Sequence, residues 1–429
     1  MKISLKMTGC KNNRYELDKI QEWAVKNGIG ITSDNEADFS IINTCTVTQV
    51  ADKKSRQLIR KTKNQNPKLK TIVFGCAARI QEDEFKKIRE IDYLLPDMKA
   101  VMEFLSLHSS SQSSESVGMT KIHHSRAFVQ IQDGCDNFCS YCIIAAARGK
   151  SKSRPTDEII DEINGYVKNG FNEIVLTGIN IGAYGCGLTT KPEESRFAEL
   201  LEKILQETDV KRIRLSSLGP EYFFNYPTCL REAVASLRRR QVTQSPIPNL
   251  RLFKVLKNPR VCRHIHLSVQ SGSDSVLKRM RRNYSVAQMD EIINRLKKEI
   301  PGIAITTDII IGFPGETYTE FDETVDFVKR NKFAKVHIFP YSIRKNTLAA
   351  KMERVPDEIK KKRASELQKI SDKLRADFIK SQTGKTVSVL WELDEEGLTD
   401  NYIKIKMLKK ISARKISNIR ITAKNAIFD

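Results

Sequence analysis

Short apolar runs alternate with amphipathic stretches over the first hundred residues of the chain. Three runs have the length and composition of buried parallel strands, at residues 1–7, 39–43 and 71–74. The stretches at 14–27 and 50–63 repeat apolar residues at helical spacing. Strands that alternate with helices of this length predict a small open α/β sheet.

A longer alternation of the same kind covers residues 126–342. Its apolar runs are separated by helical stretches and lie at residues 128–132, 173–177, 212–216, 264–270, 304–311 and 335–340. Six strands joined by helices predict a partial (β/α)6 barrel with its reactive groups at the carboxyl ends of the strands. The alternation lapses between residues 221 and 257, which we interpret as an inserted loop or helix with an Arg-rich patch at 238–240.

A long charged helix and a set of alternating stretches follow the barrel. The segments VSVLWEL and NYIKIKML indicate strands of a small β-domain. Its Lys and Arg density suits a nucleic-acid-binding surface, and a structural cap of the barrel is an equally open interpretation. The predicted α/β chain therefore has five segments: 1–106, an N-terminal domain; 107–121, a Ser-rich linker; 122–356, the barrel; 357–384, a connecting helix; and 385–429, the β-domain.

Basic residues are in excess, and the formal net charge is +21. This excess favours polyanionic partners, nucleic acid before an anionic membrane surface, although a merely basic soluble protein has the same composition. No segment approaches the ~18 uninterrupted apolar residues of a membrane span. The N-terminus also lacks the apolar run of a signal peptide, so we expect a cytoplasmic protein without a membrane partner.

Three cysteines each follow one of the predicted strands of the first sheet, at Cys10, Cys45 and Cys76. Since the carboxyl ends of parallel strands lie along one edge of a sheet, these thiols are expected to meet. The sequence therefore predicts a metal or cluster site at this edge, with three unrelated buried cysteines as the alternative. A disulfide framework is excluded by the reducing compartment.

A second set of cysteines, Cys135, Cys139 and Cys142, forms a C-x₃-C-x₂-C motif directly after the first barrel strand. Thiolates this close can hold three corners of a 4Fe–4S cluster and leave the fourth iron open. Zinc is the competing metal, but zinc sites usually pair C-x₂-C motifs or add histidine, and no histidine is suitably placed. The remaining cysteines fit buried structural thiols: Cys186, Cys229 and Cys262.

With both cysteine sets, the chain resembles the radical-SAM methylthiotransferases over nearly its whole length. The resemblance is carried by GCKNNRYE at 9–16, NTCTVT at 43–48, GC at 75–76, GCDNFCSYC at 134–142 and QSGSDSVLKRM at 270–280. It implies an N-terminal cluster domain, a central barrel and a C-terminal TRAM domain that binds RNA. It also implies two 4Fe–4S clusters, an auxiliary one on Cys10, Cys45 and Cys76, and one on Cys135, Cys139 and Cys142 that binds S-adenosylmethionine (SAM).

Within this family the sequence is most similar to the branch that acts on N6-threonylcarbamoyladenosine in tRNA. The similarity lies in NTCTVT, the following ADKKSRQLIRK, and FPYSIRKNTLAAKM. It implies that the chain places a methylthio group on C2 of that adenosine, next to the anticodon. The implied partners are tRNA, an electron donor such as flavodoxin or ferredoxin, and a sulfur donor that the sequence does not identify.

Three other functions remain open. Two are methylthiotransferases with other substrates, isopentenyladenosine in tRNA or a ribosomal protein. The third belongs to another class, a non-catalytic iron–sulfur protein that binds tRNA. A complete pair of cysteine sets argues against the third, because a pure binder has no use for two open irons.

The resemblance also implies SAM contacts at the ends of barrel strands. Backbone at Thr177 and Gly178 could approach the methionine moiety, and the turn containing Gly312, Pro314 and Gly315 could approach the adenine. Two arginines just past the cluster motif, Arg148 and Arg154, are candidates for substrate or SAM carboxylate contact. The chain departs from the family at Gly219, where a glutamate is common, so any SAM contact from that side chain is absent.

Overall fold

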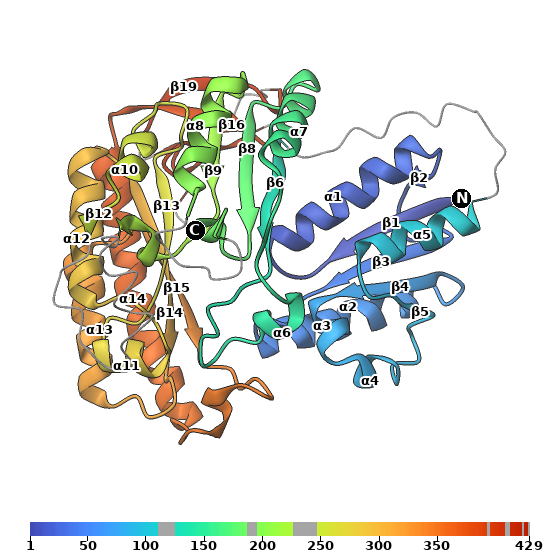
Figure 1. The fold of residues 1–429 in the computed structure, drawn as a ribbon, viewed down its shortest axis with the longest axis horizontal. Coiled ribbons are helices and arrows are strands. Elements are labelled where there is room, and N and C mark those ends of the chain that lie inside the picture. Colours follow the sequence, from blue (N-terminus) through green and yellow to red (C-terminus); the bar gives the residue numbers. More distant parts are fainter. Residues whose placement is uncertain are drawn as a thin grey trace, which may run out of the picture. The chain divides into compact units, whose positions relative to one another are not determined.

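The computed structural model describes residues 1–109, 125–186, 195–225, 247–392, 395–407, 412–422 and 424–427 (Figure 1). The chain forms two compact units. The first combines Met1–His123 with Cys142–Gly149 and Ser342–Asn346, and the second holds the rest of the chain. No helix among the described residues is both long enough and apolar enough to cross a membrane.

The first unit is built on a parallel five-stranded sheet in the order β2-β1-β3-β4-β5. Its strands are β1 Lys2–Met7, β2 Gly30–Ile31, β3 Phe39–Thr44, β4 Lys70–Gly75 and β5 Tyr93–Leu94. Its helices are α1 Lys11–Lys26, α2 Gln49–Gln65, α3 Cys76–Ile80, α4 Glu82–Phe85, α5 Met98–His108 and the short α6 Ile144–Arg148. The predicted open α/β sheet and its three main strands are confirmed.

Apolar side chains from the helices pack against both faces of this sheet. One cluster joins α1 and α5 to β1, β3 and β4 through residues such as Ile20, Val101 and Ile41. A second cluster covers the opposite face with α2, α3 and α4, through Ile59 and Phe85. The carboxyl edge of the sheet is therefore the part left for polar and sulfur-bearing side chains.

The predicted linker begins too early. Residues Leu107 and His108 belong to the last turn of α5. The ring of His108 stabilises this turn by stacking on Phe104 with centroids 3.9 Å apart. Phe104 in turn packs against Tyr93 of the sheet edge, so this turn of helix is held by an aromatic cluster. Residues 110–121 of the predicted linker lie outside the described part of the chain.

The second unit contains the six predicted barrel strands, which confirms the barrel-type α/β fold. They are β6 Arg126–Asp133, β8 Glu173–Gly178, β9 Arg212–Leu215, β13 His264–Gln270, β14 Ala304–Ile311 and β15 Lys335–Pro340. Parallel pairing links β6, β8 and β9 in one group and β13, β14 and β15 in another, with the short β7 Lys152–Ser153 and β10 Ser217–Leu218 at their edges. A bridge between Ile213 and Val261 connects the two groups.

Six helices of the described chain connect these strands: α7 Thr156–Lys168, α8 Phe197–Glu207, α10 Leu250–Leu256, α11 Asp274–Arg279, α12 Val286–Glu299 and α13 Tyr318–Asn331. The described 3₁₀ turns of this unit are η1 Ile181–Ala183, η3 Pro220–Phe223 and, after the last strand, η4 Leu348–Lys351. The ends of the segment interpreted as an insertion belong to this core, which corrects that interpretation. Phe224–Asn225 (β11) pairs with Ile247–Pro248 (β12), and Phe223 packs on Phe253 of α10 with ring centroids 5.5 Å apart. Residues 226–246, including Cys229 and the Arg-rich patch, lie outside the described residues.

A four-stranded antiparallel sheet follows the long helix α14 Asp357–Gln382. Its strands, β16 Thr386–Trp391, β17 Glu396–Thr399, β18 Lys404–Lys406 and β19 Ile416–Arg420, lie in the order β18-β17-β16-β19. Trp391 is fully buried in its core, and its indole N–H donates to Ser417 Oγ at 2.7 Å. This confirms the predicted β-domain; its RNA-binding role stays a prediction.

The turn after β17 caps the amino-terminal end of the barrel strands. Arg214 of β9 donates to the carbonyl oxygen of Thr399 at 3.0 Å, and Arg263 pairs with Asp400 at 2.6 Å. His264, the first residue of β13, stacks on Tyr402 with ring centroids 4.1 Å apart. The β-domain therefore has the capping role that the sequence left open.

A buried ion cluster anchors this cap. Glu173, the first residue of β8, has no exposed surface. It accepts a hydrogen bond from Arg214 Nε at 2.7 Å and forms an ion pair with Arg212 Nη2 at 2.8 Å. Burial would raise the pKa of Glu173, but the two guanidiniums outweigh burial and hold the pKa at about 2, below the ordinary 4.5. The pair is therefore ionised in the folded protein at neutral pH.

Acid is expected to weaken the fold through this cluster. Because the folded-state pKa of Glu173 lies below the unfolded-state value, its contribution is present above pH 4.5 and is lost as the pH falls toward about 2. The shift corresponds to about 3 kcal/mol. Urea unfolding at neutral pH and at pH ~3 measures the loss, and Glu173→Gln should show a smaller pH dependence than the wild type. An equal dependence in both proteins would contradict the assignment.

Candidate functional site

Cys10, Cys45 and Cys76 follow three neighbouring strands, as predicted. The pairing of β1 with β3 and of β3 with β4 is parallel, so the three cysteines lie at one edge of the sheet. A Cβ atom at Gly9, whose φ is +123°, would lie 2.5 Å from Cys45 Cβ and 2.9 Å from Cys45 Sγ. The glycine therefore lets the Cys45 side chain pack directly against the backbone that precedes Cys10.

Buried amides organise this edge of the sheet. Asn13 Nδ2 donates to Asn43 Oδ1 at 2.8 Å and to the carbonyl oxygen of Thr44 at 3.1 Å. The Cys10 thiol lies 3.1 Å from Asn13 Oδ1, and Asn43 Nδ2 donates to Glu16 Oε2 at 2.7 Å. Side-chain hydrogen bonds therefore connect the strand ends next to Cys10 and Cys45, in addition to the backbone hydrogen bonds of the sheet.

Arg148 approaches the third thiol of this set. Its Nε lies 3.1 Å from Cys76 Sγ, and its Nη1 forms an ion pair with Glu16 Oε1 at 2.9 Å. Burial raises the pKa of the Cys76 thiol to about 12, and the positive charge of Arg148 opposes this shift. A metal-bound cysteine is a thiolate, which is the form that a guanidinium at this distance stabilises.

The two arginines proposed from sequence thus have partners within the protein. Arg148 contacts Cys76 and Glu16 from α6. Arg154 donates to the carbonyl oxygen of Gln130 at 2.8 Å and to Glu162 Oε2 at 2.6 Å. In this structure, therefore, Arg148 is directed toward a cysteine of the N-terminal set.

The loop that carries Cys135 and Cys139 begins at a buried glutamine. Gln132, near the end of β6, donates to the carbonyl oxygen of Gly134 at 2.7 Å and to Ser151 Oγ at 2.9 Å. Its Oε1 accepts from the backbone N–H of Asn180 at 2.8 Å. This fully buried residue fixes the start of the loop and was not predicted as a functional residue. The signal in the sequence was a glutamine near the end of an apolar strand, directly before the cysteine motif.

Arg282 lies beside Cys139 as Arg148 lies beside Cys76. Its Nη1 is 3.3 Å from Cys139 Sγ, and its Nε and Nη2 donate to Tyr284 Oη at 2.6 Å and to the carbonyl oxygen of Ser268 at 3.1 Å. Burial raises the pKa of Cys135 to about 11, and Arg282 acts against this shift. No motif in the sequence pointed to Arg282 as a residue of the site.

The third cysteine of the motif, Cys142, belongs to the segment assigned to the first unit. Its Sγ lies 3.5 Å from the backbone nitrogen of Ile144. Among the described residues, no three His, Cys, Asp or Glu side chains converge closely enough to hold a single metal ion. A 4Fe–4S cluster binds each thiolate to a separate iron, so its ligands stand further apart than those of one ion.

The glycines predicted to contact SAM occupy positions where close strand pairing or a positive φ angle favours glycine. A Cβ atom at Gly178 would lie 2.8 Å from the carbonyl oxygen of Gln132, so the close pairing of β6 and β8 requires a glycine after Thr177. Gly312 and Gly315 have positive φ angles of +65° and +71° on either side of Pro314. Strand packing at Gly178 and the positive φ angles of Gly312 and Gly315 therefore explain these glycines without a ligand, and backbone contact with SAM stays a prediction.

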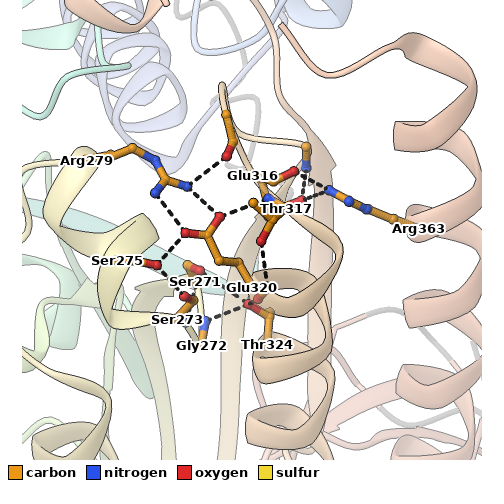
Figure 2. A network of polar contacts seen from close by, with 12 residues as sticks. Ser271, Gly272, Ser273, Ser275, Arg279, Glu316, Thr317, Glu320, Thr324 and Arg363 are labelled. Atoms are coloured by element: carbon orange, nitrogen blue, oxygen red, sulfur yellow. Dashed lines mark hydrogen bonds and ion pairs between the residues drawn. The ribbon is translucent and has the colours of Figure 1, made fainter. Parts of the chain in front are cut away.

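Figure 2 shows the polar network that holds this turn. Glu316 Oε2 accepts from the backbone N–H of Gly312 at 2.8 Å and from Arg363 Nη1 of α14 at 2.6 Å. Arg279 of the QSGSDSVLKRM segment pairs with Glu320 at 2.7 Å, and Glu320 forms a capping box with Thr317 at the start of α13. Three segments far apart in sequence are thereby fixed to one another at the ends of β13 and β14.

Two family models match the chain, the radical SAM superfamily over residues 129–328 and the uncharacterized protein family UPF0004 over residues 2–96. The threonylcarbamoyladenosine tRNA methylthiotransferase MtaB of Bacillus subtilis (strain 168) is 34% identical, over 94% of this chain and 89% of the relative. The protein of the same name from Thermotoga maritima is 34% identical, over 91% and 86%. A tRNA-2-methylthio-N(6)-dimethylallyladenosine synthase of Thermodesulfovibrio yellowstonii is 32% identical, over 98% and 95%.

Among solved structures, the radical S-adenosylmethionine methyltransferase TsrM of Kitasatospora setae, determined with cobalamin and a 4Fe–4S cluster, aligns with a TM-score of 0.56. The alignment covers 81% of this chain and 77% of TsrM at 12% identity, so it concerns the fold alone. The sequence relatives go further, because they match both cysteine-bearing parts of the chain in one alignment. The chain belongs to the radical-SAM methylthiotransferase family.

Proposed function

We propose that this enzyme replaces the C2 hydrogen of N6-threonylcarbamoyladenosine in tRNA, next to the anticodon, with a methylthio group. The observation that carries the proposal is the 34% identity, over more than nine tenths of the chain, to relatives named for that reaction. An unactivated aromatic C–H bond resists ordinary acid–base chemistry, so a cofactor must supply the reactive species while the protein positions it.

Cys135, Cys139 and Cys142 are the proposed ligands of the SAM-binding 4Fe–4S cluster, and Cys10, Cys45 and Cys76 those of the auxiliary cluster. The two clusters and SAM supply the radical and the transferred sulfur. The contacts of Arg148 and Arg282 with one thiol of each set support this assignment, since a buried guanidinium favours the thiolate form. Gln132 holds the start of the SAM-cluster loop. Thr177, Gly178, Gly312, Pro314 and Gly315 stay the proposed SAM contacts.

The implied partners form part of the proposal. The net charge of +21 supports tRNA as the substrate, because phosphate contacts favour a basic protein. Radical generation requires an electron donor such as flavodoxin or ferredoxin, together with a sulfur donor of unassigned identity. A tRNA substrate and thiols that must stay reduced support a cytoplasmic location.

The second candidate substrate is isopentenyladenosine in tRNA. The 32% identity to a relative named for the dimethylallyl nucleoside favours it over a ribosomal protein. Reconstituted enzyme should be incubated with anticodon stem-loops that carry either modified adenosine, with SAM, reductant and a sulfide source. We expect a methylthio product from the threonylcarbamoyl substrate only. A product from the isopentenyl substrate only would overturn the substrate assignment and leave the reaction class in place.

A further inference from the structure

Gly219 lies between β10 and η3, in ordinary extended backbone with φ −73°. Its conformation does not call for a glycine, because any residue adopts that φ. A Cβ atom at this position would lie 2.6 Å from Glu221 Cδ and 2.7 Å from Glu221 Oε1. The carboxylate of Glu221, two residues later, thus occupies the space that a side chain at position 219 would fill.

The Glu221 carboxylate is buried and poorly satisfied. The residue is 7% exposed, and Oε1 accepts one long hydrogen bond, from Asn137 Nδ2 at 3.3 Å. Oε2 has no hydrogen-bond partner in the described part of the chain. The Arg282 guanidinium interacts electrostatically with this carboxylate, but the two form no ion pair among the described residues. Burial of a carboxylate without an ion pair or a full set of donors is costly, so such a group in a native protein calls for a ligand.

The carboxylate is also held in place and lies beside the cluster loop. Asn137, its one donor, stands between Cys135 and Cys139 in that loop. The neighbouring Tyr222 accepts from Asn180 Nδ2 at 2.7 Å, and its ring packs closely against the backbone of Gly182. These contacts prevent η3 from turning Glu221 outward to solvent.

We propose that Glu221 binds SAM, its carboxylate accepting hydrogen bonds from the cofactor. This inference rests on the proposed function, which places SAM at the adjacent cluster loop. SAM offers two kinds of donor that a buried carboxylate can take, the ammonium group of its methionine part and the hydroxyl groups of its ribose. Glu221 thereby supplies from a new position the carboxylate that Gly219 lacks.

Glu221→Gln keeps the shape of the side chain and removes its charge. In the reconstituted holoenzyme, equilibrium dialysis with labelled SAM is expected to show a Kd at least about tenfold higher than that of the wild type. Iron content should be unchanged, and the midpoint of thermal unfolding should stay level or rise, because the substitution removes a buried charge. Gly219→Ala should weaken SAM binding as well, because the added methyl group displaces the carboxylate. The matched control is Glu207→Gln on α8, an exposed glutamate expected to leave the Kd unchanged.

Two competitors identify the donor that Glu221 meets. Methionine carries the ammonium group only, and 5′-methylthioadenosine carries the ribose hydroxyls only. A weaker competition in Glu221→Gln by either compound supports the inference and names the group. A Kd for SAM in Glu221→Gln equal to that of a SAM-binding wild type would overturn the inference and leave the proposed function intact. A wild-type holoenzyme that binds no SAM would overturn the proposed function itself.

Discussion

Cys139→Ala is expected to abolish production of 5′-deoxyadenosine from SAM while the N-terminal cysteines retain their iron. Cys139 is the middle cysteine of the C-x₃-C-x₂-C motif, and its thiol lies beside Arg282 in the second unit. Cys10, Cys45 and Cys76 all lie in the first unit. Because a 4Fe–4S cluster is held by few thiolates, loss of one removes it, and iron should fall from about eight to about four per chain.

The assay is chromatographic quantification of 5′-deoxyadenosine in the reduced, reconstituted protein, together with iron analysis. Cys186→Ala is the matched control, because Cys186 is fully buried and stands outside both cysteine sets. This control should retain SAM cleavage. Undiminished 5′-deoxyadenosine from Cys139→Ala would remove Cys139 from the radical-generating site. A wild-type protein that cleaves no SAM under any reducing condition would favour the non-catalytic tRNA-binding protein.

Glu173→Gln is expected to lower the free energy of unfolding of the second unit by about 3–5 kcal/mol at neutral pH. The substitution leaves Arg212 and Arg214 buried without their shared counter-charge. Breaking one side of a buried pair costs more than the pair itself contributes, because the remaining charge stays desolvated. The effect should extend to the β-domain, since Arg214 also donates to the carbonyl oxygen of Thr399.

Chemical unfolding monitored by the fluorescence of Trp391, in the core of the β-domain, measures this loss. Trp23, the other tryptophan, lies in the first unit and reports on that unit separately. The control is Glu202→Gln, which breaks the half-exposed ion pair with Arg251 and should cost at most about 1 kcal/mol. A loss for Glu173→Gln no larger than that of the control would show that the buried cluster does not stabilise the cap.

The strands were predictable because burial on both faces leaves an unbroken apolar run. For β13, β14 and β15 the predicted and observed bounds coincide. The start of α1 was predicted at Arg14, whereas the helix begins at Lys11. Its first turn contains the buried polar residues Asn12 and Asn13. Because a search for apolar residues at helical spacing ignores buried amides, it places the start of this helix too late.

The cysteine sets were predictable from position, and the residues that support them were not. A cysteine that directly follows a parallel strand is predicted to lie at the carboxyl edge of the sheet. The guanidinium beside Cys139 comes from a residue 143 positions later, and the one beside Cys76 from a residue 72 positions later. Such contacts depend on tertiary packing, which local pattern does not encode. Glu221 was not predicted as a site residue, because the sequence pattern places it in the segment interpreted as an insertion.

Mass spectrometry of the nucleosides in total tRNA, from cells with and without this gene, tests directly whether the chain modifies N6-threonylcarbamoyladenosine. We expect that loss of the gene removes 2-methylthio-N6-threonylcarbamoyladenosine and leaves its unthiolated precursor, and that the intact gene restores it. Restoration should fail with the Cys139→Ala gene. An unchanged level of that nucleoside, in cells without a second enzyme of this kind, would contradict the proposed function.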